Sequence, residues 1–362
     1  MNRWPLVIEN RFKGGLVDHA RFSKTHDLLI QAVSSLEFDR LVDVRGPTGI
    51  GKSTLLQTFE RSLTDFVLEN PDIGRNPPII IDAKPSESGN FDFKVFYRQI
   101  LESLNDPQYE CLEGMSVNSE SFWRRWNQEL RLVSPTEFGE HVAKVLSVKK
   151  PIAVLIDEAP HMFATKSEDV DATALEVLKG WNNRGLTHIV MFGTLEFEEV
   201  IYDSSQLARR AQRIDFLNYK KTNDDVSELL GIVHDVLEAV EVNPEFCLTS
   251  YGDEIYDGSV GCVGTLVEWC LRACSQPNVE KNQVVSKADF DTTKLSLRQL
   301  ESIEKSISNY PTSNSEGSKN YLIPFSNAGE SQNGPHQKGA KNRPGLRNVT
   351  RDPLGHKKRG SN

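Results

Sequence analysis

Residues Gly46–Thr54 read GPTGIGKST and fit the pattern of a phosphate-binding loop: Gly, any four residues, Gly, Lys, then Ser or Thr. Glycine adopts backbone angles that other residues avoid, so such a loop can wrap around an anion with its N–H groups facing inward. Lys52 is expected to reach the β- and γ-phosphates of ATP, and Ser53 to coordinate Mg²⁺. The residues expected to contact the nucleotide are Gly46, Pro47, Thr48, Gly49, Ile50, Gly51, Lys52, Ser53 and Thr54.

The flanking sequence has the order that this loop requires. A short β-prone run, LVDV at 41–44, precedes the loop, and apolar residues recur at helical spacing over 55–63. A helix that begins near Lys52 would add its positive N-terminal end to the anion site. The alternative is a chance glycine-rich turn between a strand and a helix, which the second motif below disfavours.

The second motif is PIAVLIDE at 151–158, in which five apolar residues lead into two carboxylates. Such a run predicts a strand buried on both faces, as in a parallel sheet, with its acids at the edge where α/β proteins bind ligands. Asp157 is expected to hold Mg²⁺, through water or through Ser53, and Glu158 to polarise the attacking water as general base. A strand that ends in a solvated acidic turn is the alternative.

Composition and charge narrow the class of protein. The chain has 362 residues, 38% of them hydrophobic and 26% charged, which is enough for one large globular domain or two small ones. No apolar run approaches membrane-spanning length and the N-terminus lacks a signal-peptide pattern, so we expect a cytoplasmic protein that does not bind membranes.

The C-terminal tail differs from the rest of the chain. Residues 338–362 carry eight Lys or Arg and one Asp, a net charge of +7; since the whole chain carries −9, residues 1–337 carry −16. A basic tail on an acidic body suggests an arm that binds a polyanion or docks a protein, with a merely solubilising tail as the alternative. From about residue 309 the composition predicts disorder, interrupted by the apolar island YLIPF at 321–325.

Predicted strands and helices alternate up to about residue 219 and then give way to helices alone. We expect strands at 41–44, 77–82, 151–157, 187–192 and 214–216. Helices are expected at 27–36, 53–63, 91–104, 120–133, 136–146 and 172–184, and later over 226–237, 264–273 and 288–307. This pattern predicts an α/β fold, a parallel sheet covered by helices, followed by a small all-α unit.

The order of these features is that of a P-loop AAA+ ATPase. In that class a polar residue after the next strand, here Thr194, contacts the γ-phosphate or orients water. Arg209 and Arg210 would reach into the ATP site of a neighbouring subunit, because a guanidinium is always charged and can bind two phosphate oxygens. Hydrolysis would then depend on assembly. A surface ion-pair role is the alternative for these two arginines.

Four segments resemble TnsC/TniB ATPases, the transposition regulators of Tn-seven-like transposons, some of them CRISPR-associated. The segments are IDEAPHMF (156–163), FGTLEF (192–197), SSQLARRAQRIDF (204–216) and GCVGTLVEWCLRA (261–273). The resemblance covers roughly residues 20–275, and its FGT and QLARR stretches are more specific than the generic nucleotide motifs. It implies a bacterial ATPase that forms a homo-oligomer, a ring or helical filament, on double-stranded DNA and links a target-selector protein to the transposase.

The resemblance carries over residue by residue. Lys52, Ser53, Asp157, Glu158 and Thr194 match the ATP-site positions of the family. Either member of the arginine pair at 209–210 would be the trans-acting residue. The sequence departs from the wider AAA+ pattern at the start of the helix at 264–273, where no Gly-x-Arg provides a second nucleotide sensor.

These features divide the chain into four expected parts: an N-terminal extension (1–25), an AAA+ nucleotide-binding α/β domain (26–219), an α-helical lid domain (220–308) and a disordered basic tail (309–362).

DNA contacts are expected to be with phosphates and largely indifferent to base sequence, because no DNA-reading motif is visible. The candidates are Lys84 and three arginines that are interleaved with tryptophans in the predicted helix at 120–133: Arg124, Arg125 and Arg131. The alternative is that the tryptophans are core and the arginines solvated. Because the body of the chain is acidic, assembly would have to gather the basic residues of several subunits into one track.

Two other functions compete with a transposition regulator. A signalling or defence NTPase switch would carry an effector or repeat-sensor domain, of which the sequence shows no pattern. A non-hydrolysing scaffold would use ATP only as a structural ligand and would have no need of a base such as Glu158.

Overall fold

The computed structural model describes residues 19–34, 41–83, 91–104, 135–163, 177–178, 180–181, 184–194 and 211–308. Several predictions fall outside the described residues and stay predictions: the helix at 120–133, the tail from residue 309, Lys84, Arg124, Arg125, Arg131, Arg209 and Arg210.

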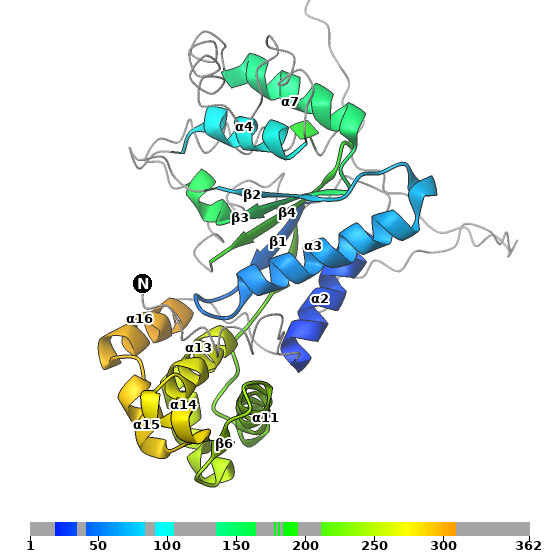
Figure 1. The fold of residues 1–362 in the computed structure, drawn as a ribbon. Coiled ribbons are helices and arrows are strands. Elements are labelled where there is room, and N and C mark those ends of the chain that lie inside the picture. The colour runs from blue at the N-terminus through cyan, green and yellow to red at the C-terminus, as the bar shows by residue number, and fades with distance from the viewer. Residues whose placement is uncertain are drawn as a thin grey trace, which may run out of the picture. The chain divides into compact units, whose positions relative to one another are not determined.

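Five parallel strands form the main sheet (Figure 1). They are β1 (Leu41–Arg45), β2 (Ile79–Asp82), β3 (Ala153–Asp157), β4 (His188–Gly193) and β5 (Ala211–Asp215). Their order across the sheet is β2-β3-β4-β1-β5, so β1 lies between β4 and β5. The predicted parallel sheet is confirmed. β5 begins three residues before the predicted 214–216, because Gln212 and Arg213 are polar and partly exposed on an edge strand and give no apolar strand pattern.

The inner strands β3, β4 and β1 are almost wholly buried, and the apolar runs of β3 and β4 are typical of strands covered on both faces. The edge strand β2 instead alternates: Ile79 and Ile81 are buried, whereas Ile80 is 39% exposed. Because side chains of a strand point alternately to opposite faces, this pattern leaves one face of β2 only partly covered.

Charged residues interrupt the apolar pattern of β1. Asp43 and Arg45 are fully buried and form an ion pair with each other. The register with β5 sets Arg213 beside Asp43 and Asp215 beside Arg45, and Arg213 pairs with Asp215 at 2.7 Å. Opposite charges therefore alternate across the two strands, which offsets part of the cost of removing them from water.

Helices pack on both faces of the sheet (Figure 1). One face is covered by α2 (Ala20–Val33) and α3 (Lys52–Glu69), whose apolar residues join those of the strands. Members of this first cluster include Leu29, Val33, Val42, Val44, Leu55, Phe59 and Leu155. α2 begins seven residues before the predicted 27–36 and inside the expected N-terminal extension, because buried Phe22 and Thr25 extend the apolar spacing of Leu29 and Val33.

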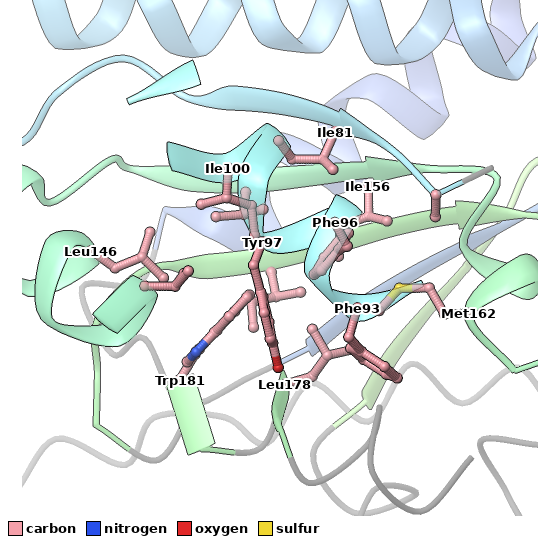
Figure 2. Close-up of a cluster of buried hydrophobic side chains, with 14 of the residues drawn as sticks. Ile81, Phe93, Phe96, Tyr97, Ile100, Leu146, Ile156, Met162, Leu178 and Trp181 are labelled. Atoms are coloured by element: carbon pink, nitrogen blue, oxygen red, sulfur yellow. The ribbon is translucent and has the colours of Figure 1, made fainter. Parts of the chain in front are cut away.

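The other face is covered by α4 (Phe93–Ser103) and α7 (Pro135–Lys149), which agree with the predicted helices at 91–104 and 136–146. Asp92 caps α4 by accepting from the N–H groups of Lys94 and Val95. Figure 2 shows the cluster here, in which α4 residues pack with Ile81, Leu146, Ile156, Met162, Leu178 and Trp181. Phe96 stacks on Trp181 with ring centroids 6.2 Å apart.

Residues 220–308, which we call the lid, have their own core. The lid helices are α11 (Asn223–Ala239), α12 (Gly252–Ser259), α13 (Val263–Cys274), α14 (Pro277–Asn282), α15 (Lys287–Thr293) and α16 (Leu297–Ser308), with a short parallel pair, β6 (Asn243–Pro244) and β7 (Val284–Val285). Trp269 is fully buried there and donates from Nε1 to the carbonyl oxygen of Phe290 at 2.9 Å.

The prediction of one helix over 288–307 is wrong, because helical structure stops at the end of α15 and begins again at the start of α16. Ser296 starts the second helix: its N–H and its hydroxyl both donate to the side-chain oxygen of Gln299, at 3.0 and 2.7 Å. This Ser-x-x-Gln pattern is a helix-start signal that outweighs the continuous apolar spacing.

Short 3₁₀ helices at Pro71–Ile73, Ala159–Met162 and Leu248–Tyr251 complete the described elements. None of the helices in the described part of the chain has the length and apolarity that a membrane span requires.

Candidate nucleotide-binding site

The phosphate loop connects β1 to α3 at the carboxyl edge of the sheet. Gly49 and Gly51 have φ angles of 78° and 110°, in the region that glycine enters without a steric cost. α3 begins at Lys52, as predicted, and Gly51 is its N-cap. Because glycine has no side chain to bond the first N–H groups of the helix, these groups are left for an anion. Ser53 and Thr54, in the first turn, are exposed.

The side chain of Lys52 lies inside the loop. Its Nζ donates to the carbonyl oxygens of Gly46 and Pro47, at 2.9 Å each. Burial lowers the pKa of Lys52, while the negative charges of Glu158 and Asp157 act in the opposite direction. The lysine is therefore a partly buried cation whose neighbours are the loop and the two acids of the second motif.

Asp157 is the last residue of β3, and Glu158 follows it. The Glu158 N–H donates to Asp157 Oδ1 at 3.0 Å. Burial raises the pKa of Asp157, to which the charges of Glu158 and Asp82 add, while the bond from the Glu158 N–H and the charge of Lys52 lower it. The carboxylates and the ammonium thus act on one another across one site.

Glu158 has an unusual backbone. Its φ is 52°, in the left-handed region, which costs a residue with a Cβ about 1 kcal/mol. Strain of this kind gathers at functional sites. The side chain is half-exposed, and His161 Nε2 lies 3.8 Å from its Oε2. The carboxylate is thus partly open to solvent.

Asp82 is a residue of this site that the sequence analysis did not assign. It ends β2 and is the register partner of Asp157 on β3, and the Ala83 N–H donates to the Asp157 carbonyl oxygen at 2.9 Å. The sequence could have predicted it, because IIID at 79–82 repeats the pattern of the second motif, an apolar strand that ends in an acid.

Thr194 directly follows β4 and is half-buried. The carbonyl oxygen of its neighbour Gly193 accepts the Gly46 N–H at 3.3 Å, so the end of β4 lies against the start of the phosphate loop. The structure therefore brings the loop, the two acids and the Thr194 backbone to one edge of the sheet. The arginine pair at 209–210 lies outside the described residues.

The start of α2 was expected to be part of an extension, yet it packs against the connection between β5 and the lid. His19 Nδ1 lies 2.9 Å from the Tyr219 hydroxyl, and the His19 ring stacks on Phe216. The Arg21 guanidinium lies 4.2 Å from the centre of the Tyr219 ring and pairs with Asp225 at 2.7 Å. These aromatic and charged contacts are between residues about 200 positions apart, which a local pattern cannot predict.

Residues 39–201 match the AAA domain family. Three solved structures resemble the chain with a TM-score of 0.51. The ORC2 protein of Aeropyrum pernix, solved as ADPNP–ADP complexes, is 13% identical, and the match covers 80% of this chain and 66% of that one. A Walker-type ATPase of Pyrococcus abyssi is 15% identical, with coverage of 81% and 73%. Cdc6p of Pyrobaculum aerophilum is 13% identical, with coverage of 79% and 70%. The chain has the AAA+ P-loop fold.

At these identities the solved structures support the fold alone, and the match spans just under two thirds of the ORC2 chain. No curated protein matches the sequence. The AAA+ fold implies nucleotide binding, usually with Mg²⁺. The residues present fit both groups, because the glycine loop, the Lys52 ammonium and the Ser53 hydroxyl suit phosphate and Mg²⁺, and carboxylates lie beside them.

Proposed function

We propose that the protein hydrolyses ATP at the site formed by the phosphate loop, Asp157 and Glu158. The observation that carries this proposal is the placement of Lys52 inside the loop, bonded to the Gly46 and Pro47 carbonyl oxygens, at the edge of the sheet where β3 ends in Asp157. The charges of Asp157 and Glu158 also act to raise its pKa. A cation beside a glycine loop and two carboxylates at the same edge of a parallel sheet is the arrangement that phosphoryl transfer needs.

Each side chain has a separate task in this proposal. Lys52 exchanges its bonds to the Gly46 and Pro47 carbonyl oxygens for bonds to phosphate oxygens, which also draws the loop around the anion. Ser53 and Asp157 hold Mg²⁺, which neutralises phosphate charge when bound. Glu158 accepts a proton from the attacking water, and Thr194 contacts the γ-phosphate or orients that water.

We infer further that hydrolysis serves an assembly on DNA in transposition. The resemblance of residues 20–275 to TnsC/TniB ATPases supports this role. Arg209 or Arg210 completes the ATP site of the neighbouring subunit in a ring or filament. The four basic residues proposed for DNA line the assembly and bind duplex phosphates without reading the bases. The assembly then joins a target selector to the transposase, and the basic tail and its apolar island contact these partners.

The four-part division of the chain belongs to the same proposal: 1–25, 26–219, 220–308 and 309–362. The separate apolar core of the lid around Trp269 supports a boundary near residue 220. The start of α2 at Ala20 means that the last residues of the proposed extension pack with the nucleotide-binding domain.

The experiment measures ATP hydrolysis by the full chain with and without duplex DNA, alongside sedimentation of the same mixtures. We expect hydrolysis that duplex DNA stimulates, and assembly that requires ATP. Duplexes of unrelated sequence should act alike, because contacts are with phosphates. A protein that stays monomeric with ATP and DNA and shows no stimulated hydrolysis would contradict the role in transposition; hydrolysis without assembly would leave an ATPase of another function.

A further inference from the structure

The N-terminus of α13 lies directly against the phosphate loop. The Thr265 N–H donates to the Gly49 carbonyl oxygen at 2.9 Å. A Cβ placed on Gly264 would lie 2.6 Å from that oxygen and 3.3 Å from the Gly51 nitrogen. Backbone therefore meets backbone here, and any residue other than glycine at position 264 would force the helix and the loop apart.

The Thr265 side chain faces the same loop. A Cβ placed on Gly49 would lie 2.3 Å from Thr265 Oγ1, so this hydroxyl occupies the space beside the glycine. Thr265 is only 6% exposed, and within the described part of the chain its hydroxyl makes no hydrogen bond. Its backbone, and not its hydroxyl, makes the described bond to the loop.

Other lid residues hold this contact in place. Cys262, the N-cap of α13, is fully buried and belongs to the same apolar cluster as Ile50 of the loop and Phe216 of the β5–α11 connection. Gly261 fits tightly as well: the Tyr219 N–H donates to its carbonyl oxygen at 2.9 Å, and a Cβ on it would lie 2.1 Å from the Tyr219 oxygen. The start of α13 is thus held between the phosphate loop and the β5–α11 connection.

We propose that Gly264 and Thr265 are positioning residues through which the lid sets the shape of the phosphate loop and hence the affinity for nucleotide. This inference rests on the proposed function, because it takes ATP as the ligand of the loop. The Thr265 N–H fixes the direction of the Gly49 carbonyl, and the peptide group is rigid, so the orientation of the following N–H is fixed with it. Coupling is reciprocal, so a bound nucleotide in turn holds the lid against the loop.

The contact also offers a reason why the start of this helix lacks the Gly-x-Arg nucleotide sensor of many AAA+ proteins. An arginine at this place would reach the nucleotide through its long side chain. Here Gly264 of α13 and Gly49 of the loop instead let the start of the helix contact the loop directly. In this proposal the lid responds to the nucleotide through its contact with the phosphate loop, and no lid side chain has to reach the phosphates.

The first test compares Gly264→Ala with Gly231→Ala, using binding of a fluorescent ATP analogue and thermal unfolding. Gly231 is a helical glycine of α11 with open space around its Cβ position, so it controls for a glycine-to-alanine change in a lid helix. Alanine favours helix at both sites, so α13 itself should not be weakened. We expect Gly264→Ala to raise Kd by about tenfold, a usual size for coupling between two sites, and Gly231→Ala to leave it within about twofold.

The second test is a double-mutant cycle with Gly49→Ala and Thr265→Ala. In the wild type the new methyl of Gly49→Ala meets the threonine hydroxyl, whereas without that hydroxyl the nearest remaining atom is the residue 265 Cβ at 3.6 Å. The backbone cost of a Cβ at φ 78° is the same in both backgrounds. We expect Gly49→Ala to weaken nucleotide binding about fivefold less in the Thr265→Ala background, since contacting residues couple and distant ones do not.

The outcomes separate this inference from the proposed function. If the wild-type protein binds no nucleotide, both are wrong. If the wild type binds and Gly264→Ala melts normally and binds as tightly, the proposed ATPase stands and the coupling through α13 is wrong. Where Gly264→Ala fails to fold, the cycle decides: equal effects of Gly49→Ala in the two backgrounds contradict the contact, and unequal effects support it.

Discussion

Asp82 and Asp157 are register partners at the ends of the adjacent strands β2 and β3. The charge of Asp82 adds to burial in raising the pKa of Asp157. Two carboxylates at neighbouring strand ends repel each other unless a cation lies between or beside them. The pair therefore gathers negative charge at this edge of the sheet, which a bound Mg²⁺ would offset, and it includes an acid that does not belong to the second motif.

The first prediction concerns this pair. Asp157→Asn should abolish Mg²⁺-dependent hydrolysis, because it removes a proposed ligand. Asp82→Asn should instead lower the apparent Mg²⁺ affinity by about tenfold, the usual effect of losing a group that supports a ligand. Titration of hydrolysis with Mg²⁺ measures both. An unchanged Mg²⁺ dependence in Asp82→Asn would show that this carboxylate only shares the sheet edge with the site.

The second prediction concerns Lys52. Lys52→Ala should weaken ATP binding by about 100-fold, because charge-assisted hydrogen bonds contribute about 1.5–3 kcal/mol each. It should also prevent assembly on DNA. Calorimetric titration with ATP and sedimentation with duplex measure the two effects. The exposed Lys24 of α2 offers a matched control, because Lys24→Ala removes the same charge from the surface and should bind ATP like the wild type.

The third prediction concerns Glu158. Glu158→Gln keeps the size and the left-handed backbone of the residue but removes the base, so ATP binding and assembly should persist. The turnover rate should fall by about 10²–10⁴-fold, the usual contribution of a general base. Assemblies should remain on DNA longer than those of the wild type, because we propose that hydrolysis is the step that dismantles them. Equal turnover in the variant and the wild type would mean that another group activates the water.

The fourth prediction concerns the arginine pair. The double variant Arg209→Ala with Arg210→Ala should bind ATP normally but lose hydrolysis by about 10³-fold or more, as expected for an arginine that acts in trans. Mixing this variant with Glu158→Gln should restore part of the activity, because a mixed interface combines an intact base with an intact arginine. No recovery on mixing, in assemblies that contain both variants, would contradict action between subunits.

Much of the fold follows from local sequence, because β3 and β4 contain long apolar runs and the phosphate loop is a contiguous motif. The predicted bounds of α4 and α7 and the start of α3 at Lys52 were close for the same reason. Predictions failed where the local signal was ambiguous. β5 contains the polar residues Gln212 and Arg213 before its first buried residue, and Ser296 begins a new helix within a spacing that otherwise predicts one helix.

The site was only partly predictable. Lys52, Asp157 and Glu158 belong to recognisable motifs, whereas the approach of Thr265 to Gly49 joins residues more than 200 positions apart. No spacing within either segment encodes that contact. The glycines of GCVG at 261–264 were visible in the sequence, but the backbone atoms they accommodate belong to other elements. Only the folded chain shows what those glycines leave room for.

The last prediction concerns the buried charges of β1 and β5. Burial raises the pKa of Asp43 to about 6, although Arg45 and Arg213 act to lower it. In the unfolded chain the pKa of an aspartate is near 3.8, so between these values the folded protein binds the proton more tightly. The contribution of Asp43 to stability is therefore fully present below pH 3.8 and is lost as the pH rises through about 6.

Asp43→Asn removes this titration and keeps the shape of the side chain. Between about pH 5 and 7.5, the free energy of unfolding of the wild type should fall relative to the variant by about 1 kcal/mol, as linkage for one such group requires. Urea unfolding at several pH values measures the difference, in which the titrations common to both proteins cancel. A difference that stays constant with pH over this range would instead mean that the guanidinium of Arg45 outweighs burial and keeps Asp43 ionised throughout.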